Sequence, residues 1–249
     1  MRLPFHHALK RLLVDAFSGA EYSSSELAMK ALRSVRRPCT RQVGQELLQW
    51  LEDRGIRRLV HFTRLENVPK IMQFGLIPRE YLEMEAVKLA LGSYFSDQVR
   101  GEGMPHFSCL SITSPNYSMF FSKRNRLRGD WAVLELDATA VCQLHFVFTP
   151  TNAASSGVTP IAGVEGAERL FSRPELRQEL NLKPCEPTDP QAESLCDSVL
   201  LPEYVRGIFV DSAEARAWLA ARDIEAQVGR DYFIPRRDFR YWQGRRLVT

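Results

Sequence analysis

The residues best suited to chemistry stand at the ends of apolar runs. His61 closes a short apolar run that begins at Leu59, and Thr63 follows two residues later. An imidazole and a nearby backbone amide at a strand end can bind the hydroxyl groups of a ligand. A histidine beside a strand is more often a structural residue, so this motif alone leaves both interpretations open.

A second polar group precedes the apolar run 109–113. Arg100 could bind a pyrophosphate through two parallel hydrogen bonds, and Tyr117 or Phe121 could cover a flat ring. The alternative is a surface ion pair between Arg100 and Asp97, with the aromatic side chains in the core. The residues by themselves favour that alternative.

A third group lies on a loop that contains Pro187 and Pro190 and leads to Gln191 and Glu193 at the start of an apolar strand. Because one residue separates Gln191 from Glu193, we expect both side chains on the same side of the strand. A carboxylate on a rigid loop suits catalysis, although most single glutamates at strand starts are solvated. We expect Glu193 to face solvent and to contribute little to stability.

The C-terminal segment 229–249 is basic and aromatic, whereas the whole chain has a net charge of only +3. Guanidinium groups neutralise phosphates, and aromatic rings stack on unpaired bases. The same side chains could equally pack this tail onto its domain. The residues concerned are Arg230, Arg236, Arg237, Arg240, Arg245 and Arg246, with Tyr232, Phe233, Phe239, Tyr241 and Trp242 between them.

Several classes of protein are not indicated. The five cysteines form no C-x-x-C pair and His6 and His7 stand alone, so we expect neither disulfides nor a metal. No apolar run approaches the ~18 residues of a membrane span, and the start lacks a secretory signal, which predicts a cytoplasmic protein with no membrane contact. In Gly101–His106 a histidine replaces the third glycine of the dinucleotide fingerprint, which argues against hydride transfer.

The spacing of apolar residues predicts the elements that must position these groups. Thr40 could cap a helix that Gly55 ends, with Val43, Leu47, Leu48 and Leu51 on one face. Residues 57–62 are expected as a strand and 65–72 as a helix closed by Gly75 in the left-handed conformation. The remaining predictions are helices near 80–91 and at 213–221, and strands at 107–113, 131–136, 144–148, 194–201 and 207–210.

Short strands with long irregular connections predict an α+β fold with a split, antiparallel-rich sheet and peripheral helices. We expect a helical N-terminal extension at 1–45 and one catalytic domain at 46–249, which includes the basic aromatic tail.

Taken in order, the motifs resemble the DarT family of bacterial toxins, within the NAD-dependent ADP-ribosyltransferase superfamily. The resemblance covers about residues 57–210 and is strongest at 61–75, 116–121, 149–156 and 187–193. It implies an ADP-ribosyltransferase-like fold and a toxin-type mono-ADP-ribosyltransferase. Such an enzyme cleaves NAD, releases nicotinamide and transfers ADP-ribose to guanine or thymine of single-stranded DNA.

The resemblance also implies roles for individual residues. His61 and Thr63 would bind NAD, with main-chain contacts from Phe62, and Tyr117 would occupy the aromatic position of the superfamily pattern. Arg100 would contact NAD and assist catalysis, but not as a base, because a guanidinium is always charged. Glu193 would be the catalytic glutamate. The residues expected to meet nucleic acid are Asn152, Gln191, Arg236, Arg237, Arg240 and Trp242.

The chemistry fits a carboxylate at position 193. Nicotinamide leaves as a neutral molecule from a cationic sugar, so the ribose passes through an oxocarbenium-like state. A carboxylate bound to a ribose hydroxyl would stabilise that positive charge by ~3 kcal/mol or more.

The alternatives are the same reaction on RNA bases or on protein, and a non-catalytic nucleic-acid-binding module. As partner, the resemblance implies a macrodomain-type antitoxin, an ADP-ribosyl glycohydrolase that removes the mark, in a toxin–antitoxin system for phage defence.

Overall fold

The computed structural model describes residues 33, 37–83 and 104–245. Arg100, the expected short helices before residue 33 and most of the helix expected near 80–91 lie outside these residues.

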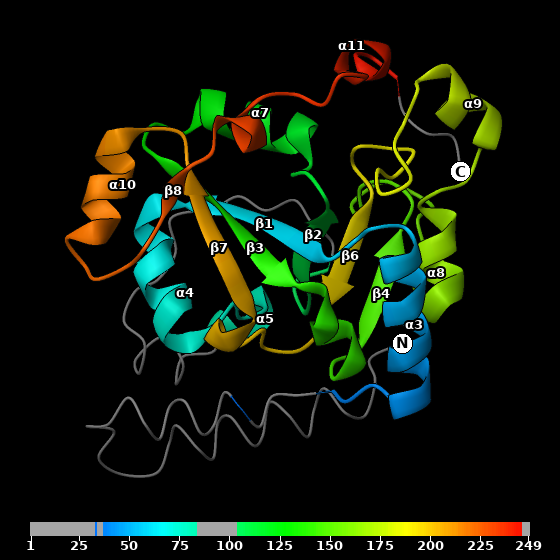
Figure 1. The fold of residues 1–249 in the computed structure, drawn as a ribbon, viewed down its shortest axis with the longest axis horizontal. Coiled ribbons are helices and arrows are strands. Elements are labelled where there is room, and N and C mark those ends of the chain that lie inside the picture. Colours follow the sequence, from blue (N-terminus) through cyan, green and yellow to red (C-terminus); the bar gives the residue numbers. More distant parts are fainter. Residues whose placement is uncertain (1–32, 34–36, 84–103, 246–249) are drawn as a thin grey trace.

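An eight-stranded sheet forms the centre of the described part of the chain (Figure 1). The strand order is β5-β4-β6-β2-β1-β3-β7-β8, and every neighbouring pair is antiparallel except β7 and β8. The predicted α+β class with an antiparallel-rich sheet is therefore confirmed. The strands are β1 (Arg58–Arg64), β2 (Ser108–Ile112), β3 (Trp131–Asp137), β4 (Phe146–Thr149), β5 (Ile161–Ala162), β6 (Glu193–Cys196), β7 (Val205–Val210) and β8 (Gln227–Val228).

The sheet is split between β1 and β2. Strand β1 pairs with β3 along its whole length, but with β2 only through Leu59 with Ile112 and Val60 with Ser111. The other end of β2 pairs with β6 instead. The two halves of the sheet therefore separate just beyond Val60, as the prediction of a split sheet requires.

Helices cover the two ends of the sheet (Figure 1). Helices α3 and α8 pack against each other beside β4, α4 packs against η3, and α10 packs against β7 and β8. The α-helices are α3 (Arg41–Asp53), α4 (Val68–Phe74), α5 (Arg79–Leu82), α7 (Tyr117–Arg126), α8 (Gly163–Arg169), α9 (Pro174–Glu179), α10 (Ala213–Ala220) and α11 (Phe239–Trp242). The 3-10 helices are η1 (Leu65–Asn67), η2 (Ala138–Cys142), η3 (Pro202–Tyr204) and η4 (Arg230–Phe233).

The predicted helix after Thr40 is present as α3, and it runs across residue 45. Leu47 and Leu51 are buried as expected, but Val43 is 41% exposed, so the predicted apolar face was wrong at its first position. Gly75 ends α4 with a φ of 90° and a ψ of 174°, which is a positive but extended conformation rather than the left-handed helical one.

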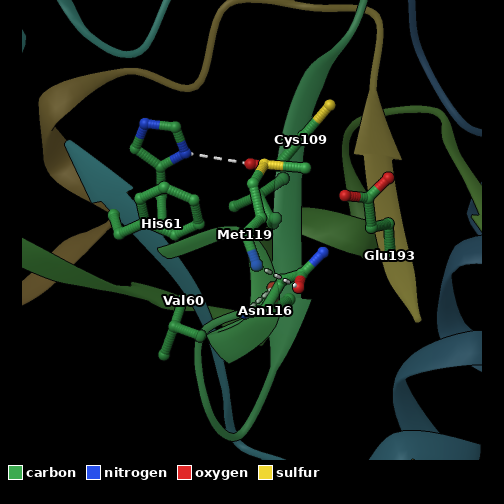
Figure 2. Close-up of a pocket in the computed structure, with 9 residues that line it drawn as sticks. Val60, His61, Cys109, Asn116, Met119 and Glu193 are labelled. Atoms are coloured by element: carbon green, nitrogen blue, oxygen red, sulfur yellow. Dashed lines mark hydrogen bonds between the residues drawn. The ribbon is translucent and has the colours of Figure 1, made fainter. Parts of the chain in front are cut away.

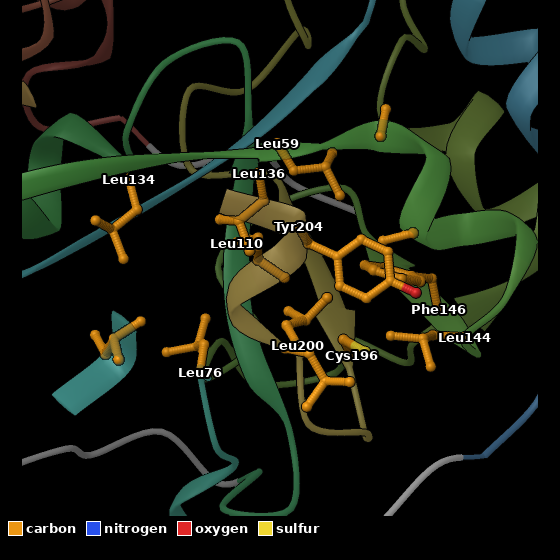
Figure 3. Packing of buried hydrophobic residues seen from close by; sticks show 14 of the residues in the cluster. Leu59, Leu76, Leu110, Leu134, Leu136, Leu144, Phe146, Cys196, Leu200 and Tyr204 are labelled. Atoms are coloured by element: carbon orange, nitrogen blue, oxygen red, sulfur yellow. The ribbon is translucent and has the colours of Figure 1, made fainter. Parts of the chain in front are cut away.

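The core lies on both faces of the sheet. Figure 3 shows the main cluster, in which leucines of the sheet strands pack against Leu76, Leu200 and Tyr204. A smaller cluster joins Val60 of β1 to Phe120 of α7 and other aromatic residues. Burial on both faces explains why β3, with the sequence WAVLELD, is a nearly continuous apolar run.

Gly44 lies on the buried face of α3, and a Cβ atom there would stand 2.7 Å from Cys142 Cα. Alanine normally stabilises a helix relative to glycine by roughly 1 kcal/mol. Here we expect Gly44→Ala to destabilise by about 1–3 kcal/mol, because α3 must move away from η2. Thermal unfolding measures this, with the exposed Gln45→Ala in the same helix as the control. An unchanged or higher Tm for Gly44→Ala would contradict the close packing of α3 on η2.

Candidate active site

A pocket opens where β1 and β2 separate. His61 of β1 and Glu193 of β6 both line it, and Figure 2 shows them on either side of β2. The structure therefore brings together two of the three side chains on which the sequence prediction depends. The third, Arg100, lies outside the described residues. The full lining consists of Val60, His61, Phe62, Cys109, Leu110, Ser111, Asn116, Met119 and Glu193.

His61 spans the split in the sheet. Its ring Nδ1 lies 2.9 Å from the backbone oxygen of Cys109, and the side chain is only 6% exposed. Because a carbonyl oxygen can only accept, Nδ1 carries the hydrogen of this bond. The imidazole is therefore fixed in orientation beside the pocket.

Glu193 is buried, so the expectation that it faces solvent was wrong. It is 3% exposed because β6 lies between β2 and β4, where Glu193 pairs with Thr149. Its Oε2 accepts a hydrogen bond of 2.9 Å from the backbone N–H of Ala153. The carboxylate is thus held in place by the loop that follows β4.

Asn152 shapes that loop. Its side-chain Oδ1 accepts from the backbone N–H of Ala154 at 2.8 Å, which forms a tight turn next to the amide of Ala153 that binds Glu193. In this structure Asn152 supports the position of the carboxylate, and contact with nucleic acid stays a prediction.

The loop before Glu193 is held by the buried Asp189. Its Oδ1 accepts from the backbone N–H of Gln191 at 2.7 Å. Burial raises the pKa of Asp189, against hydrogen bonds from Gln191 and Thr151 and the charge of Arg236.

Since β6 begins only at Glu193, strand alternation does not extend to Gln191. Gln191 lines a different pocket, called here the second hollow, which lies between the start of α7, the loop before Glu193 and the tail around α11. The expectation that Gln191 and Glu193 share one side was therefore wrong.

Arg236 of the tail faces inward and binds this loop. Its guanidinium forms two hydrogen bonds of 2.6 Å with the carboxylate of Asp238. It also donates to the carbonyl oxygens of Pro187 at 2.7 Å and Thr188 at 3.0 Å. The side chain is only 6% exposed, so the packing interpretation of the tail holds for Arg236, and contact with phosphates does not fit this arrangement.

Asp238 connects Arg236 to Trp242. The indole N–H of Trp242 donates to Asp238 Oδ2 at 2.8 Å, and Trp242 is buried, so its ring packs inward rather than stacking on a base. Burial favours a higher pKa for Asp238, but the hydrogen bonds and charge of Arg236 and the bond from Trp242 lower it below its ordinary value.

Arg237 and Arg240, the other two tail arginines predicted to meet nucleic acid, are exposed. Arg237 donates to the carbonyl oxygen of Asn181 and, at 2.9 Å, to Glu186 Oε2. Arg240 lies on α11 and is exposed. Arg237 and Arg240 are therefore better placed than Arg236 to meet a polymer.

Phe62, Thr63 and Tyr117 were also predicted to bind NAD, and only Phe62 lines the same pocket as His61 and Glu193. The ring of Phe62 stacks on Phe120, with centroids 4.6 Å apart, at the edge of the pocket. Thr63 accepts from Asn67 Nδ2 at 3.0 Å and is not among the pocket residues. Tyr117 packs against Phe239, lines the second hollow and has its pKa raised by burial, against the charge of Arg124.

The sequence prediction missed Asn116 and Met119, which α7 brings to the pocket. No helix was predicted at 117–126, although the pattern Ser114-Pro115-Asn116 is a recognisable start. Asparagine is a favoured N-cap, and here its side chain accepts from the backbone N–H of Met119.

In the described residues, no group of histidine, cysteine, aspartate and glutamate could hold a metal ion. All five cysteines are free thiols. Within residues 33, 37–83 and 104–245, no helix is both long and apolar enough to cross a bilayer.

The fold is similar to that of Thermosipho africanus DarTG in complex with ADP-ribose, with a TM-score of 0.53 and 19% identity. The match covers 73% of this chain and 52% of that one, so the chain spans about half the length of the DarTG chain. The split sheet and its pocket therefore define a protein with the fold of the DarT ADP-ribosyltransferases. The model of the DarT family, described as ssDNA thymidine ADP-ribosyltransferase, matches residues 60–222. This chain belongs to the DarT family.

Two other structures match as well. Thermus sp. 2.9 DarT in complex with NAD+ and in complex with ADP-ribosylated ssDNA each give a TM-score of 0.49 and 16% identity. The matches cover 71% and 72% of this chain and 96% of each of the others. No curated protein sequence matches the chain.

Proposed function

We propose that this chain binds NAD in the pocket between β1 and β2 and transfers ADP-ribose to a base of single-stranded DNA. The observation that supports this most is that His61 and Glu193 line one pocket of a chain that belongs to the DarT family. The family description favours thymine as the base, with guanine as the alternative.

Glu193 has the properties that the reaction requires. In the transfer, the bond between nicotinamide and C1′ of the ribose breaks, and nicotinamide leaves as a neutral molecule with the electron pair. A nitrogen of the base then bonds to C1′ and gives up its proton to Glu193 or to solvent. A buried carboxylate stabilises the positive charge on the ribose more strongly than an exposed one, because little water screens it. The hydrogen bond from Ala153 fixes its position beforehand.

The other assignments are part of the same proposal. His61 accepts from a ribose hydroxyl of NAD through Nε2, Thr63 and the backbone of Phe62 support that site, and Arg100 binds the pyrophosphate. Arg237 and Arg240 contact the phosphates of the DNA. The residues before α3 form an N-terminal extension of the catalytic domain, because α3 itself packs on η2 and α8 of that domain.

We also infer that the protein acts in the cytoplasm as a toxin. Membership of the DarT family supports a macrodomain-type antitoxin, an ADP-ribosyl glycohydrolase that removes the mark. Co-expression of such a hydrolase should restore growth to cells that produce this chain.

Incubation with labelled NAD and separate pools of single-stranded DNA, duplex DNA, RNA and protein tests the activity. We expect label on single-stranded DNA, and a mass spectrum of the released nucleoside then identifies the base. Label on protein alone, or on RNA but not DNA, would refute the proposed substrate. Intact NAD in every pool would refute the proposed activity.

A further inference from the structure

Asn116 is fixed in place at the point where β2 leads into α7. Its backbone N–H donates to Ser111 Oγ at 3.0 Å, and its side-chain Oδ1 accepts from the backbone N–H of Met119 at 3.2 Å. Between β2 and this residue, Thr113 has a φ of 64°, and the N–H of Ser114 donates to the carbonyl of Ile112 at 2.7 Å. The chain thus turns sharply, and the turn places Asn116 next to Ser111 of β2.

The orientation of the Asn116 amide follows from these bonds. If the amide were flipped, its NH2 group would face the N–H of Met119, and two donors would oppose each other. Nδ2 is therefore the atom that points away from α7. It is buried and has no hydrogen-bond partner in the described structure, and the whole residue is 1% exposed. Leaving a buried donor unsatisfied is unfavourable, so the position requires an explanation.

The surroundings of Nδ2 supply that explanation. Asn116 lines the same pocket as His61 and Glu193. In Figure 2 its amide nitrogen points from the start of α7 toward the side of the pocket where Glu193 lies. An amide nitrogen that points into this pocket can donate to an oxygen of a ligand whose entry widens the pocket.

We propose that Asn116 is a substrate-binding residue whose Nδ2 donates to an oxygen of the nicotinamide riboside half of NAD. This inference rests on the proposed function, in which Glu193 binds that same ribose. The acceptor is a ribose hydroxyl or the carboxamide oxygen of nicotinamide. Binding of NAD would satisfy the donor that the protein alone leaves unpaired.

Asn116→Asp tests the proposal without loss of the helix cap. Aspartate has the same shape, and its carboxylate still accepts from Met119 N–H, but it removes the donor. Asn116→Ser is a second variant that keeps a capping oxygen and adds no charge. We expect both variants to weaken NAD binding at least about tenfold, which corresponds to ~1.4 kcal/mol. The Tm of Asn116→Ser should stay within a few degrees of the wild type, whereas Asn116→Asp adds a buried carboxylate and its Tm should fall further.

Isothermal titration with NAD and with ADP-ribose measures these affinities. Ser212→Asp is the control, because Ser212 caps α10 in the same way, through the N–H of Ala215, and is not a pocket residue. It should bind NAD like the wild type.

The titrations identify the acceptor, and they distinguish failure of the role of Asn116 from failure of the proposed function. Weaker binding of both ligands places the acceptor on the ribose, and weaker binding of NAD alone places it on the carboxamide. Folded Asn116→Asp and Asn116→Ser proteins with wild-type affinity for NAD would overturn the role of Asn116. A wild-type protein that binds no NAD would instead overturn the proposed function.

Discussion

Glu193→Gln is expected to lower the rate of ADP-ribose transfer to single-stranded DNA at least ~1000-fold, in line with loss of a preorganised electrostatic group. Glutamine keeps the size of the side chain and an oxygen that can accept from Ala153 N–H, so the pocket should keep its shape. The variant removes only the negative charge beside the ribose. The affinity for NAD should therefore change far less than the rate.

Single-turnover kinetics with NAD and single-stranded DNA measure this effect, and titration with NAD measures binding. Glu165→Gln is the control, because Glu165 is exposed on α8 and pairs only with Arg169 in the described structure. Glutamine is a better test than alanine, since alanine would leave the buried N–H of Ala153 without its acceptor. Transfer by Glu193→Gln at a rate comparable to wild type would remove Glu193 from the catalytic step.

Arg236→Ala should combine a loss of stability with a loss of activity. Removing one partner of a buried ion pair costs about 3–5 kcal/mol, because the other charge, here Asp238, stays buried without compensation. For a chain of this size that loss lowers Tm by roughly 10 °C. The carbonyl groups of Pro187 and Thr188 would lose their donor as well, so the loop before Glu193 would no longer be held. We expect kcat to fall at least about tenfold, with a smaller change in KM for NAD.

Arg169→Ala is the control, because Arg169 is exposed on α8 and its ion pair with Glu165 should contribute less than about 1 kcal/mol. Activity is compared well below the Tm of each variant.

The salt dependence of DNA affinity adds a second test. Arg240→Ala should reduce the slope of log affinity against log salt concentration by about one unit, and Arg236→Lys should not change that slope. Normal transfer by folded Arg236→Ala would show that the tail does not position the loop.

Much of this arrangement could be predicted from local sequence. The runs of aliphatic and aromatic residues predicted β1, β2, β3, β4 and β7, because such residues favour strands. His61 and Glu193 could be singled out because each stands at an end of such a run. Their meeting in one pocket depends on the strand order, in which β6 lies next to β2, and local pattern does not determine strand order.

The sequence predictions that were wrong share one physical cause, which is that contacts between distant parts of the chain decide which way a side chain faces. Arg236 and Trp242 have the composition of a nucleic-acid-binding tail, but contacts with residues nearly fifty positions earlier in the chain turn Arg236 inward. Burial of Glu193 likewise follows from the neighbours of β6 rather than from its own sequence. Tyr117 and Asn116 are adjacent in sequence, yet the direction of α7 places one ring against the tail and one amide in the pocket.

The short contact between β1 and β2 makes substrate binding observable without any turnover. Only two residue pairs join the halves of the sheet there, and beyond them a histidine ring, not a backbone amide, donates to Cys109. A dinucleotide between the strands would connect the halves directly. Amide hydrogens near His61 and Cys109 should then exchange with deuterium more slowly when NAD is present, and this protection would report on both sides of the gap at once.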